Sequence, residues 1–167
     1  MQRKRLALES IEYAAIGVIR SPFKQRLGMP IQAAFAEWAS GVVELDPRYV
    51  RGVKDLEGFS HLILLYHFHL SEGYKLQVKP FLDEARHGVF ATRAPRRPNA
   101  IGISVVRLER IEGARLHVSG LDVVDGTPLL DIKPYVPQFD DRGDVRIGWL
   151  EKGIHLANAG KADGRFE

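Results

Sequence analysis

The sequence predicts a mainly β protein, a small antiparallel β-barrel with a few short helices. Strand signals recur roughly every 10 to 20 residues along the chain, whereas helical signals are few. Neither a glycine-rich dinucleotide-binding turn nor a P-loop is present, which argues against a parallel α/β sheet. The 167 residues are enough for one domain with its own core.

The first elements are separated by proline and aspartate. A strand is expected at 14–20, where a Ser-Pro pair stops it, and a second strand at 41–45. Between them, 24–41 lacks periodicity, which indicates an irregular loop with a short helical turn. Asp46 is then an N-cap followed by proline at the first helical position, so a short helix is expected to about residue 56.

The segment 61–69 (HLILLYHFH) is the most hydrophobic of the chain and indicates a central strand. At a period of two, one face carries Leu62, Leu64, Tyr66 and Phe68. The other face carries His61, Ile63, Leu65, His67 and His69.

Later in the chain, 101–111 and 114–124 are expected to form a hairpin about Glu112-Gly113. A further strand is expected at 128–135, with Pro134 near its end.

Composition bounds the domain organisation and excludes several classes of function. We expect a flexible N-terminal segment at 1–13, a barrel domain at 14–150 and a C-terminal tail at 151–167. The absence of cysteine excludes disulfides, zinc-thiolate sites and thiol nucleophiles. No apolar run approaches the roughly 20 residues that span a bilayer, and the basic start lacks a signal-peptide pattern, so a cytoplasmic protein is expected. A net charge of +3 is weak evidence for a nucleic-acid partner.

The stretch GVFATRAPRRPNAIGIS, residues 88–104, concentrates arginine and proline between two segments that look like strands, 89–92 and 101–106. Proline restricts the backbone, and the planar fork of arginine suits carboxylates and phosphates. The turn therefore fits an anion-binding role and, equally, a structural hairpin with surface arginines. Its cations are Arg93, Arg96 and Arg97.

Other polar groups allow alternative chemistry. His67 and His69 share a strand face, as metal ligands do, but no nearby spacing offers a third ligand, and local hydrogen bonds explain them better. Ser60-His61 and Ser104 lack the nucleophile-elbow context of a hydrolase. Asp125-Gly126-Thr127-Pro128 is good turn chemistry by itself, although a catalytic role for Asp125 stays open.

Four segments together resemble the TsaA/YaeB-type (TrmO-like) family of S-adenosylmethionine-dependent methyltransferases. The resemblance runs from about residue 14 to about 150 and implies a small β-barrel that forms a homodimer. It also implies methylation of N6 of threonylcarbamoyladenosine at position 37, in the tRNA anticodon loop, without a metal or a membrane. Some members carry a further C-terminal domain. The segments are IGVIRSPF (16–23), LEGFSHLILLYHFH (56–69), GVFATRAPRRPNAIGIS (88–104) and LDVVDGTPLLDIKPYVP (121–137).

The resemblance also implies functional residues. Asp125 is expected to act as a base or orienting acceptor, with Arg97 and Asn99 beside it, and Arg96 and Arg97 to hold the tRNA or its acidic threonyl group. Arg93 or the backbone at 31–33 would bind the cofactor carboxylate, and Asp122 its ribose. Leu70 stands where some members have glutamine, and Ala100 replaces a common proline. The residues expected at the cofactor are Ile31, Gln32, Ala33, His69, Leu70, Arg93, Ile103, Gly120, Leu121, Asp122 and Val123.

Three alternatives remain open at this point. The chain could bind S-adenosylmethionine without catalysis, it could methylate a related adenine, or it could be a histidine-metal barrel enzyme.

Overall fold

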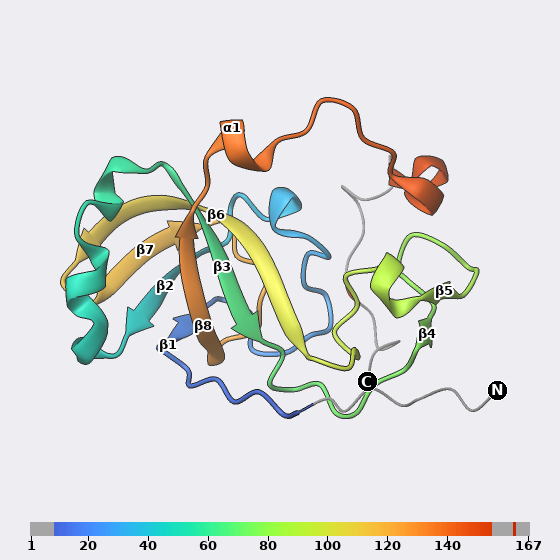
Figure 1. Ribbon diagram of the computed structural model, residues 1–167, viewed down its shortest axis with the longest axis horizontal. Helices are drawn as coiled ribbons and strands as arrows, with labels where there is room; N and C mark the ends of the chain where they lie inside the picture. Colours follow the sequence, from blue (N-terminus) through green and yellow to red (C-terminus); the bar gives the residue numbers. More distant parts are fainter. Residues whose placement is uncertain (1–8, 155–161, 163–167) are drawn as a thin grey trace.

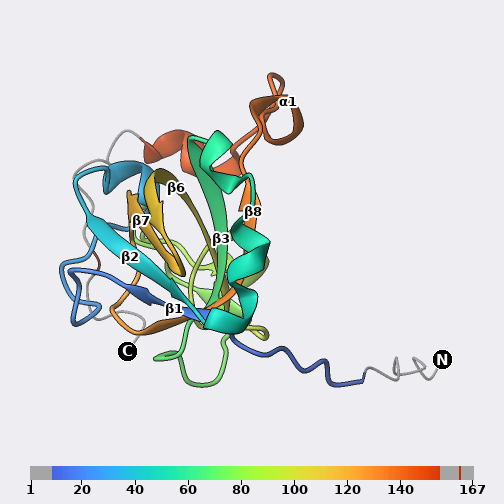
Figure 2. The same ribbon diagram turned by 90° about the vertical axis from the view of Figure 1, so that its left-hand side faces the viewer.

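The computed structural model describes residues 9–154 and residue 162, and its centre is a closed barrel of antiparallel strands (Figures 1 and 2). The strands follow one another around the barrel in the order β1-β2-β7-β6-β3-β8. The predicted fold class is therefore confirmed, and closure leaves none of these strands as an exposed edge. The strands are β1 (Gly17–Arg20), β2 (Ser40–Leu45), β3 (His61–His67), β6 (Ile101–Glu112), β7 (Arg115–Ser119) and β8 (Thr127–Pro134).

The inward face of β3 forms much of the core, as its alternation predicts. Leu62 and Leu64 are fully buried, and Tyr66 is 3% exposed. The strand ends at His67, because the backbone N–H of Phe68 donates to Ala100 and that of His69 folds back onto the His67 carbonyl. The prediction that His67 and His69 share one strand face is therefore wrong, because His69 lies in a turn beyond the end of the strand.

The predicted β6–β7 hairpin is present, and its turn is Gly113-Ala114, one residue later than the expected Glu112-Gly113, because Glu112 still pairs with Arg115. β7 ends at Ser119, earlier than the expected 124, because Gly120 adopts a left-handed conformation with φ of 87°. Its N–H and that of Leu121 both donate to the Ala39 carbonyl, which fixes the chain at this corner.

The helices are short, and most are 3₁₀ turns. The predicted Asp46 cap is present, since its carboxylate accepts a hydrogen bond of 3.0 Å from the N–H of Arg48. The predicted turn within 24–41 is also present. The 3₁₀ helices are η1 (Ala33–Phe35), η2 (Pro47–Val53), η3 (Leu56–Gly58), η4 (Val89–Ala91) and η5 (Gly148–Lys152), and the α-helix is α1 (Pro137–Asp140).

Residues 77–97 form an arm beside the barrel, in which β4 (Gln77–Val78) pairs with β5 (His87–Gly88) (Figure 1). The expected strand at 89–92 is wrong, because Thr92 closes a 3₁₀ turn by donating both its N–H and its hydroxyl to the Val89 carbonyl. The arginine-rich stretch therefore belongs to this arm. The arm has a small core of its own, made of Val78, Val89 and Ala94 with Phe81 packed against it.

The C-terminal part of the described chain crosses from the barrel to the arm (Figure 1). η5 lies against the arm, and Gly153 is buried against the carbonyl of Leu82. Of the expected N-terminal segment, 1–8 lie outside the described residues, and 9–13 are exposed without regular structure; most of the expected tail lies outside them as well. No helix within the described part is long and apolar enough to cross a membrane.

Candidate functional site

A cavity of about 820 Å³ lies where one end of the barrel meets the arm. Its size is typical of sites for small molecules and cofactors. Its walls come from segments that are far apart in sequence: the loop 26–34, the end of β3 with 68–71, the start of β6, the turn 122–127, the arm and η5.

Asp122 is the acidic group of this cavity. Leu121 and Val123 on either side are buried in the core, so Asp122 faces the opposite way, into the cavity. Its carboxylate accepts a 2.5 Å hydrogen bond from Ser104, whose hydroxyl lies 2.9 Å from that of Tyr66. Burial raises the pKa of Asp122 to about 6, although hydrogen bonds from Ser104 and the Ala33 N–H, and the charge of Arg93, oppose the rise. Asp122 therefore changes charge close to neutral pH.

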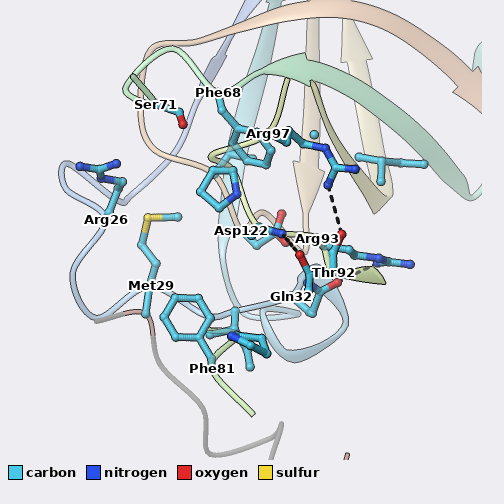
Figure 3. A pocket seen from close by; sticks show the side chains of 18 of the residues that line it. Arg26, Met29, Gln32, Phe68, Ser71, Phe81, Thr92, Arg93, Arg97 and Asp122 are labelled. Atoms are coloured by element: carbon cyan, nitrogen blue, oxygen red, sulfur yellow. Dashed lines mark hydrogen bonds between the residues drawn. The ribbon is translucent and has the colours of Figure 1, made fainter. Parts of the chain in front are cut away.

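Arginines surround this carboxylate (Figure 3). Arg93 donates a 2.7 Å hydrogen bond to the side-chain oxygen of Gln32, and Arg97 donates to the Thr92 carbonyl at 3.1 Å. Arg26 lies across the cavity and donates to the backbone at Leu70. The cavity thus combines one buried acid with cations on opposite sides, an arrangement suited to a ligand that carries both signs of charge.

The remaining walls are largely apolar. Met29, Phe68 and Phe81 line the cavity, and Phe90 lies at its mouth with 76% of its surface exposed. The Ser71 hydroxyl is buried there and has no hydrogen-bond partner within the described residues. An unpaired buried hydroxyl is costly, and a polar ligand group would satisfy it.

The structure brings most of the predicted site residues together, Arg93 and Asp122 among them. Ala33 lies outside the lining, yet its N–H reaches Asp122. Gly120 and Leu121 form the corner that aims Asp122, and Asn99 is exposed outside the cavity. The predicted residues that line the cavity are Ile31, Gln32, His69, Leu70, Arg93, Arg97, Ile103, Asp122 and Val123.

Asp125 does not line the cavity. Its carboxylate accepts hydrogen bonds from the N–H of Ser21 at 3.1 Å and from Lys24 at 2.8 Å. The bond from Lys24 lowers the pKa of Asp125 from its usual value. These contacts join the chain after β1 to the turn before β8, outside the lining of the cavity.

Sequence reasoning missed several residues of the site. Ser104 could have been found, since a polar residue at an inward position between Gly102 and Val106 of a strand signals function. Ser71 and Trp149 had no local signal, because only the fold brings them to the cavity. The described residues include no group of three potential metal ligands.

Fold and cavity together define the class of the molecule: a small closed β-barrel domain with a ligand site at one end. The chain belongs to the tRNA-methyltransferase O N-terminal domain family, whose model matches residues 18–141. The resemblance stated from its motifs is thereby confirmed.

Two sequence relatives and one crystal structure support this assignment. A probable S-adenosyl-L-methionine-binding protein of Pyrococcus abyssi is 56% identical over 92% of this chain and 84% of its own length. The tRNA (adenine(37)-N6)-methyltransferase of Escherichia coli is 41% identical over 86% of this chain and 66% of its own length. The crystal structure of TrmO from Pseudomonas aeruginosa superposes with a TM-score of 0.72 and 44% identity, covering 84% of this chain and 63% of that one. The chain therefore spans about two thirds of the last two proteins.

Proposed function

We propose that this protein is an S-adenosylmethionine-dependent methyltransferase that acts on N6 of threonylcarbamoyladenosine at position 37 of tRNA. The observation that carries the proposal is the cavity in which Asp122 and Arg93 face one ligand space, in a chain of the tRNA-methyltransferase O family. A cytoplasmic location is part of this proposal, and a tRNA substrate is consistent with it.

The residues of the cavity fit the chemistry of the cofactor. S-adenosylmethionine carries an adenine, ribose hydroxyls, an ammonium, a carboxylate and a sulfonium, and it supplies an activated methyl group when bound. Arg93 suits the carboxylate. The apolar walls at Met29, Phe68 and Phe81 suit the adenine, and the Ser71 hydroxyl would gain a partner.

Alignment is the main task of the protein in methyl transfer, because an in-line displacement needs the two reacting atoms held in position. The acceptor nitrogen carries a carbonyl group and is a weak nucleophile, so removal of its proton helps. Among the described residues, Asp122 is the only carboxylate that lines the cavity, and its pKa of about 6 suits proton transfer near neutral pH. We therefore assign proton acceptance to the Asp122 carboxylate in place of Asp125.

The arginine turn is the proposed contact with tRNA. Arg97 is half-buried in the cavity wall, and Pro95 and Pro98 restrict the backbone around it. A fork held in this way suits the acidic threonyl group of the modified base or a backbone phosphate. A base of the anticodon loop can reach the cavity without the melting of a duplex.

The proposed homodimer would use the outer face of β6. Ile101, Ile103 and Val105 are 40–46% exposed in a row along this strand. Across from them, β3 places Ile63 and Leu65 on the same outer face. Such a continuous apolar strip favours a partner, and a second copy seated there would also meet the cavity, which Ile101 and Ile103 line.

Calorimetry with S-adenosylmethionine, followed by methylation of tRNA that carries the unmethylated base, tests the function. We expect Arg97→Ala to lose methylation while cofactor affinity stays nearly intact. Arg51→Ala, an exposed arginine of η2 outside the cavity, is the matched control and should behave as wild type. Equal loss of binding and methylation would make Arg97 a cofactor residue. Cofactor binding without methylation of tRNA by the wild type would instead favour a binding module.

A paired comparison tests the acid. Asp122→Asn should reduce methylation by roughly 100-fold or more, as loss of a general base does. Asp125→Asn should leave the rate at saturating substrate within a few-fold. The opposite ranking would return the catalytic role to Asp125.

A further inference from the structure

The segment that follows the family match forms one wall of the cavity. The match ends at residue 141, yet Trp149, Leu150 and Ile154 all line the cavity. Trp149 is the residue of this wall with the most specific contacts.

Trp149 is fixed to the arm in two ways. Its indole N–H donates a 2.8 Å hydrogen bond to the carbonyl of Ala91, and its ring stacks on His87 with 4.5 Å between centroids and 18° between planes. His87 is held in turn by Asp83, at 3.0 Å. The close approach of Gly153 to the Leu82 carbonyl adds a second attachment of the same segment to the arm.

The carbonyl that Trp149 holds belongs to the base of the arginine turn. Ala91 ends η4, whose first residue, Val89, is fully buried in the small core of the arm. The next carbonyl, that of Thr92, accepts the hydrogen bond from Arg97, and Arg93 follows directly. The backbone that carries both arginines is thus fixed on one side by Val89 and on the other by Trp149.

We propose that Trp149 is a positioning residue for the ligand: it walls the cavity and holds the backbone from which Arg93 reaches the carboxylate of the cofactor. This inference rests on the proposed function for the identity of the ligand. It assigns a part in binding to a segment outside the family match.

The first experiment uses tryptophan fluorescence, because the chain has two tryptophans, Trp38 and Trp149. Trp38 is 68% exposed and does not line the cavity. In Trp38→Phe protein the emission comes from Trp149, and we expect it to change on titration with S-adenosylmethionine, with a midpoint equal to the calorimetric dissociation constant. Trp149→Phe, in which only Trp38 emits, is the matched control and should show no comparable change. An unchanged Trp149 emission at a saturation that calorimetry confirms would overturn the proposal.

The second experiment separates positioning from mere packing. Trp149→Phe keeps a ring to stack on His87 but loses the N–H, so we expect its dissociation constant for S-adenosylmethionine to rise roughly fivefold, the worth of one net hydrogen bond. 5′-Methylthioadenosine lacks the amino-acid carboxylate, and its affinity should stay within twofold of wild type. Trp149→Ala should weaken S-adenosylmethionine further, and thermal unfolding by circular dichroism reports whether each variant is folded.

The outcomes are distinct. Equal weakening of both ligands by Trp149→Phe, or of neither, would overturn the positioning role. A wild-type protein that binds neither ligand would contradict the proposed function itself, and this inference with it.

Discussion

Asp122 illustrates how a single residue acquires its chemistry from its position. The left-handed Gly120 precedes it at a corner of the chain, its side chain is buried, and Ser104, two backbone N–H groups and the charge of Arg93 compensate in part for the lost water. The charged form is therefore disfavoured in the folded protein, and the pKa of Asp122 rises to about 6. Burial of this carboxylate lowers the stability of the free protein, but it places the group where it can stabilise a bound ligand.

This state predicts a pH dependence of stability. Between pH 4 and 6 the folded protein holds a proton on Asp122 that the unfolded chain has released, so the contribution of Asp122 to the free energy of unfolding falls as pH rises through this window. Asp122→Asn should remove that slope and stabilise the free protein at pH 7.5 by up to about 3 kcal/mol, the value of a pKa rise of this size. Denaturant unfolding at pH 4 and pH 7.5 measures both effects. A variant less stable than wild type at pH 7.5 would contradict this account.

At the scale of the element, the inward-facing residues of β6 contribute both to the barrel core and to the cavity. Val106 is buried in the barrel core, whereas Gly102 lines the cavity and Ser104 bonds to Asp122. Position 102 has no room for a side chain, because it lies opposite Tyr66 in the strand pair and under the Tyr66 ring. The Tyr66 ring in turn packs edge-on against Phe68, with centroids 5.4 Å apart.

Gly102→Ala tests this packing. The added Cβ would collide with the Tyr66 ring and lie 2.8 Å from Cζ of Phe68, so one of the rings must move. We expect a loss of about 1–3 kcal/mol in the free energy of unfolding, together with weaker ligand binding. Gly52→Ala is the control, since a Cβ there meets nothing within 4 Å. Thermal unfolding of both variants checks the difference, and equal midpoints would refute the close packing at Gly102.

At the scale of the whole molecule, the cavity exists because the barrel, the arm and the C-terminal segment meet. The closed barrel has no free edge, so a partner cannot extend its sheet by strand pairing. The exposed strip on β6 is the face proposed for the second copy.

Val105→Lys tests this assembly. Val105 is 40% exposed, so the barrel should stay folded while a charge enters the proposed interface. At the same concentration, we expect the wild type to sediment as the proposed dimer and the variant as a monomer. Val145→Lys, an exposed valine outside the barrel strands, should leave the dimer intact. A Val105→Lys protein that dimerises like wild type would move the interface elsewhere.

The parts of the fold that were predicted correctly depend on local patterns. The alternation of β3, the Asp46-Pro47 helix start and the β6–β7 hairpin are each set by neighbouring residues, and each occurs within one residue of where it was expected. Predictions failed where long-range contacts override local preference. Val89 begins a 3₁₀ turn because it is buried in the core of the arm, and β3 stops at His67 because the chain folds back there.

The same division holds for the site. The motifs by themselves determined the family and the barrel class, and most of the site residues that they predicted line the cavity, because a motif records which side chains a ligand requires. Only the tertiary structure decided that Asp122 faces the cavity whereas Asp125 binds Lys24, and that Trp149 closes one wall. The physical reason is that the direction of a side chain after a turn, its burial and its pKa all depend on segments that are distant in sequence.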